Sequence, residues 1–454
     1  MPLIKSISGF RGTIGGRAGD NLTPQDIVES VAAFGTMLLS RTDKRKVVIG
    51  RDGRPSGQLV SQLTASTLQM LGLDVVDLGY ATTPTVEMAV TRLEAAGGII
   101  LSASHNPVAY NALKLLGENG EFISAAEGQE MLQLLANDDI VYATVDQLGS
   151  YETSNDELVH HIQAILDHPL VEVEAIRRAK FKLVLDAVNS VGALAIPMLC
   201  NILEVDCKII NGQLNGQFAH NPEPLPAHLT DLMQRVVATG ADLGVAVDPD
   251  VDRLALVGPG GHWIGEEYTL VTVADYVLAK DPGPVVSNLS SSRALADLAA
   301  QYGQTYKAAA VGEVNVVAKM KEIGATIGGE GNGGIIDPRL HYGRDSLIGL
   351  ALVLSHLATS GKTINELRAG YPQYEMVKDK LQLEAGMDVD AILQSIPAQF
   401  PDAKVNVVDG VKLDFDEGWL HLRKSNTEPI IRIYAEAGSQ DEAQKLVDRL
   451  KRLI

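Results

Sequence analysis

Two polar segments that lie far apart in the chain carry residues that could together transfer a phosphoryl group. Residues 102–107 read SASHNP and residues 248–253 read DPDVDR. Three carboxylates at alternate positions repel one another unless a cation compensates them, and a serine near such a cation could carry phosphate. A serine in a turn is by itself usually only a turn former. Together the two segments indicate phosphoryl transfer assisted by a divalent cation.

The tri-aspartate segment predicts a metal site. Asp248, Asp250 and Asp252 lie between two apolar stretches and offer only oxygen ligands, which suit Mg²⁺, Ca²⁺ or Mn²⁺ better than zinc. A solvated acidic turn is the alternative. An EF-hand is excluded, because Arg253 stands where that loop needs glycine and Pro259 where it needs the bidentate glutamate.

Ser104 is the candidate phosphate carrier. It follows the apolar stretch 98–101, so we expect it at the carboxyl end of a strand, where α/β sheets place ligands. Lys114 could act as acid and base if burial or a cationic neighbour lowers its pKa; without such a setting it is a surface lysine. His105 could equally be a turn histidine.

Three further motifs bear on ligands. Residues 329–334 (GEGNGG) match the letters of a dinucleotide loop, but Pro338 argues against the helix such a loop needs, and Glu330 could instead face sugar hydroxyls. The GKT sequence at 361–363 lacks the leading glycine of a P-loop. Residues 423–429 (RKSNTEP) are dense in phosphate donors, although a polar hairpin loop explains them equally well.

Alternating strand and helix patterns predict the scaffold that positions these segments. Apolar stretches at 47–49, 183–185 and 285–286 each precede a helical pattern, which indicates an α/β fold with three similar α/β domains and mostly parallel mixed sheets. After about residue 370, strands joined by short turns favour an antiparallel α+β domain. The expected domains are 1–155, 156–257, 258–370 and 371–454.

Composition restricts the class of partner. The net charge of −19 argues against nucleic acid and anionic membranes. No stretch reaches the length of a membrane span and the N-terminus lacks a signal-peptide pattern, so we expect a cytoplasmic protein. Cys200 and Cys207 lie in an apolar stretch that reads as strand, and we expect them to be reduced.

In their order, these motifs resemble those of the α-D-phosphohexomutase family, and the resemblance covers essentially the whole chain. The family's phosphoserine, metal, sugar and phosphate loops are similar to residues 102–107, 248–253, 329–334 and 423–429. Ser102 replaces the family's threonine, which is a mild change, and Ala112 replaces a frequent glycine before the lysine. Asn426 replaces the glycine of the phosphate loop, and asparagine tolerates the left-handed conformation. The sugar loop differs most, because Asn332 and Gly334 replace the family's serine and histidine.

The resemblance implies four domains around a central cleft and a phosphoserine mechanism with a hexose 1,6-bisphosphate intermediate that also serves as activator. One Mg²⁺ per active site would be held by the three aspartates and an oxygen of phosphorylated Ser104. Lys114 would be acid and base, with Arg11 and His105 near the phosphoserine. The remaining implied substrate-binding residues are Arg253, Glu330, Asn332, Arg423, Ser425, Asn426, Thr427 and Arg432.

The substrate would be a small phosphosugar. We expect glucosamine phosphate, because the compact length resembles bacterial phosphoglucosamine mutases; glucose or mannose phosphate is the alternative. A metal-dependent sugar phosphatase would use the same residues. A non-catalytic phosphosugar sensor predicts loss of the serine or an aspartate, and all are present. The expected assembly is a monomer or a homodimer.

Overall fold

The computed structural model describes residues 3–6, 9–137, 139–383, 388–424 and 430–453. The chain forms two compact units: unit 1 comprises Met1–Thr269 and Gly333–Asn365, and unit 2 comprises Leu270–Asn332 and Glu366–Ile454. Each unit is described by itself.

The first sheet of unit 1 is mixed, with strand order β1-β2-β6-β5-β3-β4-β7. Strand β3 is parallel to β4 and β5, whereas β6 is antiparallel to β5 and β2. The strands are β1 (Ile4–Ser6), β2 (Gly9–Thr13), β3 (Lys46–Arg51), β4 (Asp74–Tyr80), β5 (Gly97–Leu101), β6 (Tyr110–Leu116) and β7 (Tyr151–Thr153).

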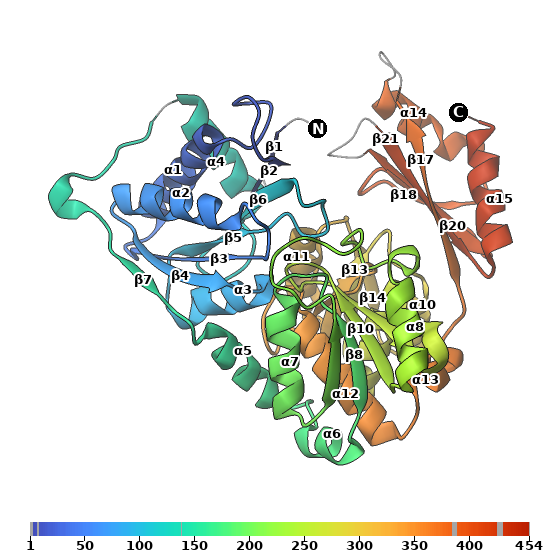
Figure 1. The fold of residues 1–454 in the computed structure, drawn as a ribbon. Helices are drawn as coiled ribbons and strands as arrows, with labels where there is room; N and C mark the ends of the chain where they lie inside the picture. The colour runs from blue at the N-terminus through green and yellow to red at the C-terminus, as the bar shows by residue number, and fades with distance from the viewer. Residues whose placement is uncertain (1–2, 7–8, 138, 384–387, 425–429, 454) are drawn as a thin grey trace. The chain divides into compact units, whose positions relative to one another are not determined.

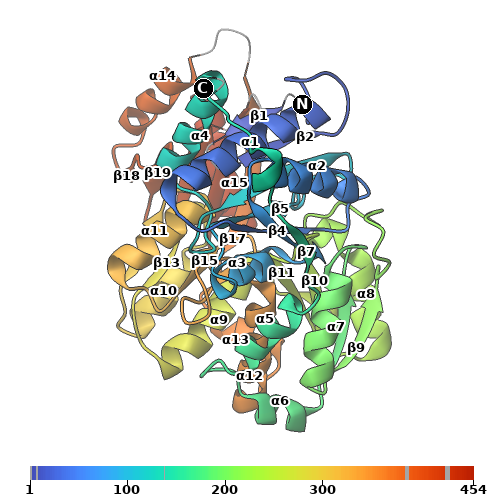
Figure 2. The same cartoon turned by 90° about the vertical axis from the view of Figure 1, so that its left-hand side faces the viewer.

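Helices cover both faces of this sheet because its strands are apolar on both. Helices α1, α2 and α4 lie on one side and α3 on the other (Figures 1 and 2). Val47 and Ile49 belong to the core under α1 and α2, whereas Val48 packs with α3, as expected from the two-residue period of a strand. The helices are α1 (Pro24–Arg41), α2 (Gly57–Met70), α3 (Thr83–Arg92) and α4 (Ala125–Asn137).

The sequence Thr23-Pro24-Gln25-Asp26 carries a helix-start signal, and helix α1 begins there. Thr23 is its N-cap and forms a capping box with Asp26, and Pro24 occupies the first helical position.

The second sheet of unit 1 has the order β12-β11-β10-β8-β9. Strands β9, β8 and β10 are parallel, and β10 forms an antiparallel pair with β11. Its strands are β8 (Lys182–Asp186), β9 (Asp206–Ile210), β10 (Leu243–Val247), β11 (Leu254–Gly258) and β12 (His262–Trp263). Nearby helices are α5 (Glu157–Leu166), α6 (Val173–Ala179), α7 (Gly192–Ile202) and α8 (Thr230–Thr239).

Both cysteines are free. Cys207 lies in strand β9, but Cys200 lies in helix α7, so the strand expected around Cys200 is wrong. A short apolar stretch fits a buried helix as well as a strand.

Unit 1 ends with β16 (Gly334–Ile336) and α12 (Ser346–Ser360). Gly361 caps α12 in the left-handed conformation (φ +68°), so the GKT segment follows a helix end and is not a P-loop. Within the described residues no single helix could cross a membrane by length and composition; only the bent pair of α12 and α13 (Ile364–Gly370) passes that test together.

Unit 2 contains a parallel group in which β13 (Val285–Asn288) pairs with β14 (Tyr306–Ala309) and β15 (Ile327–Glu330). Helices α10 (Ala294–Gln301) and α11 (Glu313–Ile323) alternate with these strands, and α9 (Glu266–Lys280) precedes them.

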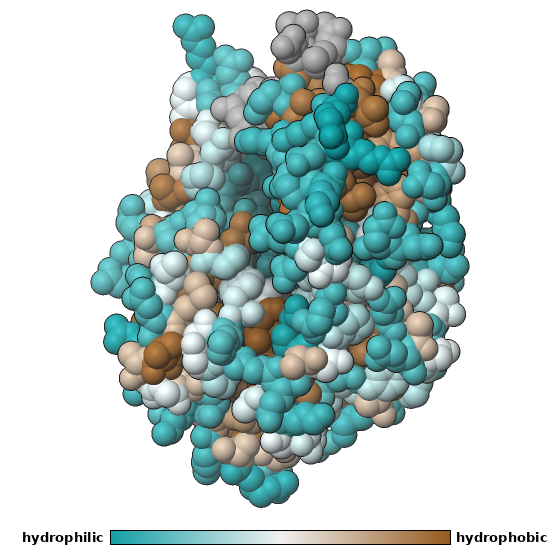
Figure 3. Space-filling model, turned by 90° about the vertical axis from the view of Figure 1, so that its right-hand side faces the viewer, coloured by the Kyte–Doolittle hydropathy of each residue, from teal (hydrophilic) through white to brown (hydrophobic). Residues whose placement is uncertain are grey.

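The C-terminal part of unit 2 is an antiparallel sheet of order β17-β21-β20-β19-β18, as expected from the sequence. Its elements are β17 (Glu375–Gln382), α14 (Val389–Ser395), β18 (Lys404–Asn406), β19 (Val411–Asp414), β20 (Gly418–Lys424), β21 (Ile430–Ala437) and α15 (Gln440–Lys451). Helix α15 buries Leu446, Val447 and Leu450 in this domain's core. The face of the molecule drawn in Figure 3 is mostly hydrophilic, with apolar side chains in small groups.

Candidate active site

The candidate serine lies in a strained turn directly after strand β5. Ser104 is buried and has a φ of +48°, a left-handed conformation that costs a non-glycine residue about 1–2 kcal/mol. Its backbone N–H donates to Ser102 Oγ at 2.9 Å, and its own Oγ donates to Asp248 Oδ2 at 2.6 Å. The strained turn therefore directs the hydroxyl at the first aspartate of the metal loop.

A buried guanidinium holds this turn in shape. Arg54, which is 1% exposed, forms an ion pair with Asp52 at 3.0 Å, and Asp52 accepts the hydroxyl of Ser102 at 2.7 Å. The guanidinium also donates, at 2.6–2.9 Å, to the backbone carbonyls of Ser104, Asn106, Pro107 and Tyr110. Hydrogen bonds to a charged group contribute about 1.5–3 kcal/mol each, so this network can offset the strain at Ser104.

The three aspartates lie in the turn between β10 and β11, and all three are fully buried. Val251 between them has a φ of +64°, which is unfavourable for a β-branched residue. Asp248 Oδ1 accepts the backbone N–H groups of Asp252 and Arg253, both at 3.1 Å. One oxygen from each aspartate lies within 4.8 Å of the others.

Two cationic side chains and a hydroxyl contact this triad. Lys114 on β6 approaches Asp250 at 2.6 Å and Asp252 at 3.3 Å. Arg344 donates to Asp252 at 2.7 Å. Thr83, the first residue of α3, donates its hydroxyl to Asp250 at 2.7 Å and its backbone N–H to the Asp250 carbonyl at 2.9 Å.

The pKa of Lys114 moves in the direction opposite to the one considered from the sequence. Burial lowers it, but the charges of Asp250 and Asp252 outweigh burial, so the pKa of Lys114 is raised above its ordinary value. Burial, followed by the charges of Asp252 and Asp250, raises the pKa of Asp248 well above its usual range. Lys114, Arg344 and, at 3.9 Å, Arg253 thus pair with Asp250 and Asp252, whereas Asp248 accepts the hydroxyl of Ser104.

The triad fits a hard divalent cation. Asp250 Oδ1 and Asp252 Oδ1 are buried and accept no hydrogen bond from any described residue. Buried carboxylate oxygens need a partner, and an all-oxygen set suits Mg²⁺, Ca²⁺ or Mn²⁺. The geometry is therefore that of a possible acidic metal site beside Ser104.

Three further predicted residues surround the same site. Arg11 on β2 donates to the side chain of Asn106 at 2.9 Å. The charge of Arg253, followed by burial and the charge of Arg11, lowers the pKa of His105 well below its usual range, so its imidazole is neutral. Arg253 lies 3.9 Å from Asp252 and 3.7 Å from Glu223.

Residues 329–332 of the predicted sugar loop lie in unit 2, and the segment is a strand followed by a turn rather than the start of a helix. Glu330 ends β15 and is 3% exposed. Its carboxylate accepts hydrogen bonds from the Asn288 side chain at 2.8 Å and the Gly312 backbone at 3.1 Å. Asn332 is half-buried two residues further on. The strand confirms that this glycine-rich segment is not a dinucleotide loop.

A row of basic residues crosses the C-terminal sheet beside the predicted phosphate loop. Arg423 on β20 lies opposite Arg432 on β21, and Arg432 lies opposite Lys380 on β17. Directly opposed residues share a face, and like charges placed this way are unfavourable. The row is therefore a candidate anion site. The predicted residues Ser425, Asn426 and Thr427 lie outside the described residues.

Sequence reasoning missed several residues that the structure brings to these sites. Arg54 and Arg344 lie outside the motifs and reach their partners only through the fold, and Lys380 becomes part of the basic row only through strand register. Thr83 carries a weak signal, because Thr82, Thr83 and Pro84 predict a capped helix start. The catalytic roles assigned to the predicted residues stay predictions.

The chain matches, domain by domain, the families described as phosphoglucomutase/phosphomannomutase. Alpha/beta/alpha domains I, II and III match residues 4–140, 156–261 and 266–374, and the C-terminal domain matches residues 381–453.

Relatives and solved structures show the same affiliation. A phosphoglucomutase/phosphomannomutase of Thermococcus kodakarensis is 36% identical, with 96% of each chain covered. A probable phosphoglucosamine mutase of Methanopyrus kandleri is 32% identical, with 98% of this chain and 97% of the relative covered. A phosphoglucomutase/phosphomannomutase family protein from Burkholderia thailandensis superposes with a TM-score of 0.86 at 27% identity, covering 99% of this chain and 96% of that one.

The fold extends to more distant mutases. An N-acetylphosphoglucosamine mutase of Aspergillus fumigatus, solved with GlcNAc-6P and magnesium, has a TM-score of 0.57 at 16% identity, with 90% of this chain and 82% of that one covered. On the four domain matches and the full-length relatives, the chain belongs to the phosphoglucomutase/phosphomannomutase family of α-D-phosphohexomutases, which are phosphosugar mutases.

Proposed function

We propose that this phosphohexomutase interconverts glucosamine 6-phosphate and glucosamine 1-phosphate through phosphorylated Ser104 and a bound 1,6-bisphosphate. The observation that carries the proposal is the 2.6 Å contact between the Ser104 hydroxyl and Asp248, which joins the two motifs of the reaction. The preference for glucosamine rests on relatives such as the probable phosphoglucosamine mutase of Methanopyrus kandleri.

The first half-reaction moves the phosphoryl group from Ser104 to a sugar hydroxyl. The bond between phosphorus and Ser104 Oγ breaks as the sugar oxygen bonds to phosphorus. Lys114, which its raised pKa keeps as an ammonium, would first give a proton to the departing serine oxygen and would then regain one from the attacking sugar hydroxyl. Transfer of the other phosphate of the bisphosphate back to Ser104 restores the enzyme, and added bisphosphate activates it.

Mg²⁺ is the proposed metal, with one ion per active site. Asp248, Asp250 and Asp252 would hold it together with an oxygen of phosphorylated Ser104. The ion supplies Lewis-acid compensation of the charge that develops on the transferred phosphoryl group. The chain itself contributes the strained serine turn and the Arg54 network that fixes it.

Recognition of the sugar and of the phosphate that does not react is assigned to the remaining residues. Glu330, fixed by Asn288 and Gly312, would accept sugar hydroxyls, with Asn332 beside it. Arg11, His105 and Arg253 would contact the transferring phosphate. Residues proposed for the other phosphate are Arg423, Ser425, Asn426, Thr427 and Arg432.

The proposed setting is that of a cytoplasmic enzyme of small metabolites. We propose that it acts as a monomer or a homodimer on free phosphosugars, without nucleic acid or membrane partners. Its charge of −19 supports this assignment.

A coupled assay across four substrates tests the proposal. The enzyme is given Mg²⁺, catalytic bisphosphate and the 6-phosphates of glucosamine, glucose, mannose or N-acetylglucosamine. We expect the highest kcat/KM with glucosamine 6-phosphate. A higher kcat/KM with glucose or mannose phosphate would overturn the substrate assignment while leaving the mutase class in place.

An isotope experiment distinguishes hydrolysis of the phosphoserine from phosphoryl transfer to the sugar. In water enriched in ¹⁸O, a phosphatase releases labelled inorganic phosphate, whereas a mutase returns unlabelled phosphosugar. Release of labelled phosphate at the rate of substrate consumption would contradict the mutase mechanism.

A further inference from the structure

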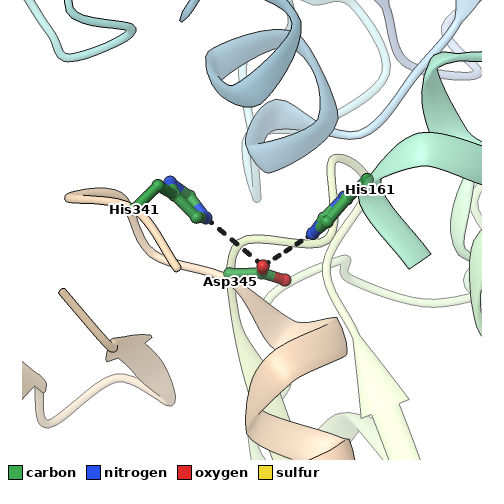
Figure 4. A group of neighbouring side chains, drawn as sticks. All are labelled: His161, His341 and Asp345. Atoms are coloured by element: carbon green, nitrogen blue, oxygen red, sulfur yellow. Dashed lines mark hydrogen bonds and ion pairs between the residues drawn. The ribbon is translucent and has the colours of Figure 1, made fainter. Parts of the chain in front are cut away.

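A second group of possible metal ligands lies in unit 1 at the start of helix α12. Asp345 is the N-cap of this helix: its Oδ1 accepts the backbone N–H groups of Leu347 at 2.8 Å and Ile348 at 3.4 Å. Its other oxygen, Oδ2, faces the Nε2 atoms of His161 at 2.8 Å and His341 at 3.3 Å. Figure 4 shows the two imidazoles converging on this one carboxylate.

The second nitrogen of each imidazole also has a suitable neighbour. His161 Nδ1 lies 3.0 Å from Thr85 Oγ1. His341 Nδ1 lies 3.5 Å from Glu87 Oε2. Metal-binding histidines almost always direct the nitrogen that does not bind metal toward a carboxylate, carbonyl or other polar group, which fixes the ring and its tautomer. Both histidines therefore have the outer partners that such ligands require.

Burial and charge favour a cation at this place. His161 is 1% exposed, Asp345 0% and Glu87 1%. The carboxylate of Asp345 is thus fully buried between two imidazoles, which are neutral when they bind a metal. Burial of an ionised group is costly unless a counter-charge compensates it.

A glycine permits the approach of His341 and Glu87. A Cβ atom on Gly343 would lie 2.0 Å from Glu87 Oε2 and 2.8 Å from His341 Cε1. Real Cβ atoms do not approach other atoms so closely, so a side chain at this position would separate the imidazole from its carboxylate.

We propose that His161 Nε2, His341 Nε2 and Asp345 Oδ2 bind a divalent transition-metal ion of the Zn²⁺ class, separate from the aspartate triad. The ligand atoms lie within 4.8 Å of one another. Two imidazoles and one carboxylate suit zinc, whereas magnesium prefers oxygen alone. Water would complete the coordination of the ion.

The ion would join three segments that are distant in sequence. Thr85 and Glu87 belong to α3, His161 belongs to α5, and His341 and Asp345 precede α12. Thr83, the first residue of α3, donates its hydroxyl to Asp250 of the aspartate triad. A metal at this position would therefore cross-link the scaffold that carries the active site, and its role would be structural.

Metal stoichiometry tests the proposal. The chelator-treated full chain is dialysed against ZnCl₂ in excess MgCl₂, which competes for the aspartate triad, and zinc per chain is measured. We expect one zinc per chain in the wild type and in Asp250→Asn, and none in His341→Asn. The matched control is His160→Asn, because His160 is exposed and adjacent to His161; this variant should keep the zinc. Zinc lost in Asp250→Asn but kept in His341→Asn, or no zinc in the wild type, would overturn the proposal.

Two conservative variants separate metal loss from misfolding. Asp345→Asn removes the ligand charge but keeps a good helix cap, so circular dichroism should be unchanged while zinc is lost. Glu87→Gln should weaken zinc binding by roughly 10–100-fold, the usual effect of removing an outer carboxylate. With Co²⁺ as the probe, X-ray absorption should show nitrogen ligands in the wild type and not in His341→Asn. Oxygen-only coordination in the wild type would contradict the site.

Discussion

The two units of the chain differ in how their charged side chains are arranged. Unit 1 buries three carboxylates and pairs them with the cations Lys114, Arg344 and Arg253. In unit 2, a row of like charges, Lys380, Arg432 and Arg423, lies across neighbouring strands. The first arrangement suits bond making at a cation and the second suits holding an anion. We therefore expect changes in unit 1 to act mainly on kcat and changes in the basic row to act mainly on KM.

The largest effect is expected at Ser104. Ser104→Ala removes the phosphate carrier, so kcat should fall by at least about 10³-fold, as when a covalent catalytic group is lost. Steady-state kinetics with added bisphosphate give the value. Ser40→Ala, at an exposed serine of α1, should keep wild-type kcat. Near-normal turnover in Ser104→Ala would show that Ser104 is not the phosphate carrier, and phosphoryl transfer could then no longer be assigned to unit 1.

The next effect tests whether Arg54 positions the serine turn. The compact ammonium group of lysine cannot donate to all four backbone carbonyls that the Arg54 guanidinium contacts. Arg54→Lys should therefore displace Ser104 and lower kcat by about 10²-fold. KM should change little, because Arg54 is buried under the turn. Arg51→Lys, at the half-buried neighbour that stacks on Tyr80, should retain kcat. A rise in KM with unchanged kcat would mean that Arg54 acts on binding instead.

Mg²⁺ bound to the aspartate triad should raise the free energy of unfolding. Mg²⁺ at 100 times its Kd should stabilise the wild type by about 2.7 kcal/mol. Asp250→Asn should lose this gain without unfolding, which thermal melts with and without MgCl₂ would show. Asp231→Asn, at an exposed acid of α8, should keep it. An equal Mg²⁺ shift in Asp250→Asn would place the stabilising ion elsewhere.

The smallest effect is expected in the basic row. Lys380→Ala removes one charge from the anion-binding face, and KM should rise by about 10-fold, the equivalent of about 1.4 kcal/mol. The value of kcat should stay within about twofold of wild type. Lys404→Ala, at an exposed lysine of β18, should change neither constant. If kcat of Lys380→Ala fell by as much as KM rose, the basic row would take part in catalysis, and the proposed difference between the two units would be wrong.

Much of the fold follows from local pattern. The apolar run before Ser104 ends as strand β5, and the runs on either side of the aspartates are strands β10 and β11. Cys200 shows the limit, because a short apolar stretch suits helix and strand alike. Thr23 and Pro24 could be assigned because capping depends on neighbours in the chain.

The surroundings of the site could not be predicted, because they depend on contacts between distant residues. Lys114 meets Asp250 and Asp252 across 136 and 138 positions, and these two contacts raise its pKa. Arg54 reaches the serine turn across 50 positions. No local signal distinguishes such residues from surface cations.

The backbone of Val251 has a consequence for protein engineering. Glycine at this position would relieve the strain of the left-handed conformation, about 1–3 kcal/mol, but would also remove a fully buried side chain, which costs about as much or more. Attempts to raise heat resistance should therefore leave this valine in place and look for stabilising changes outside the metal loop.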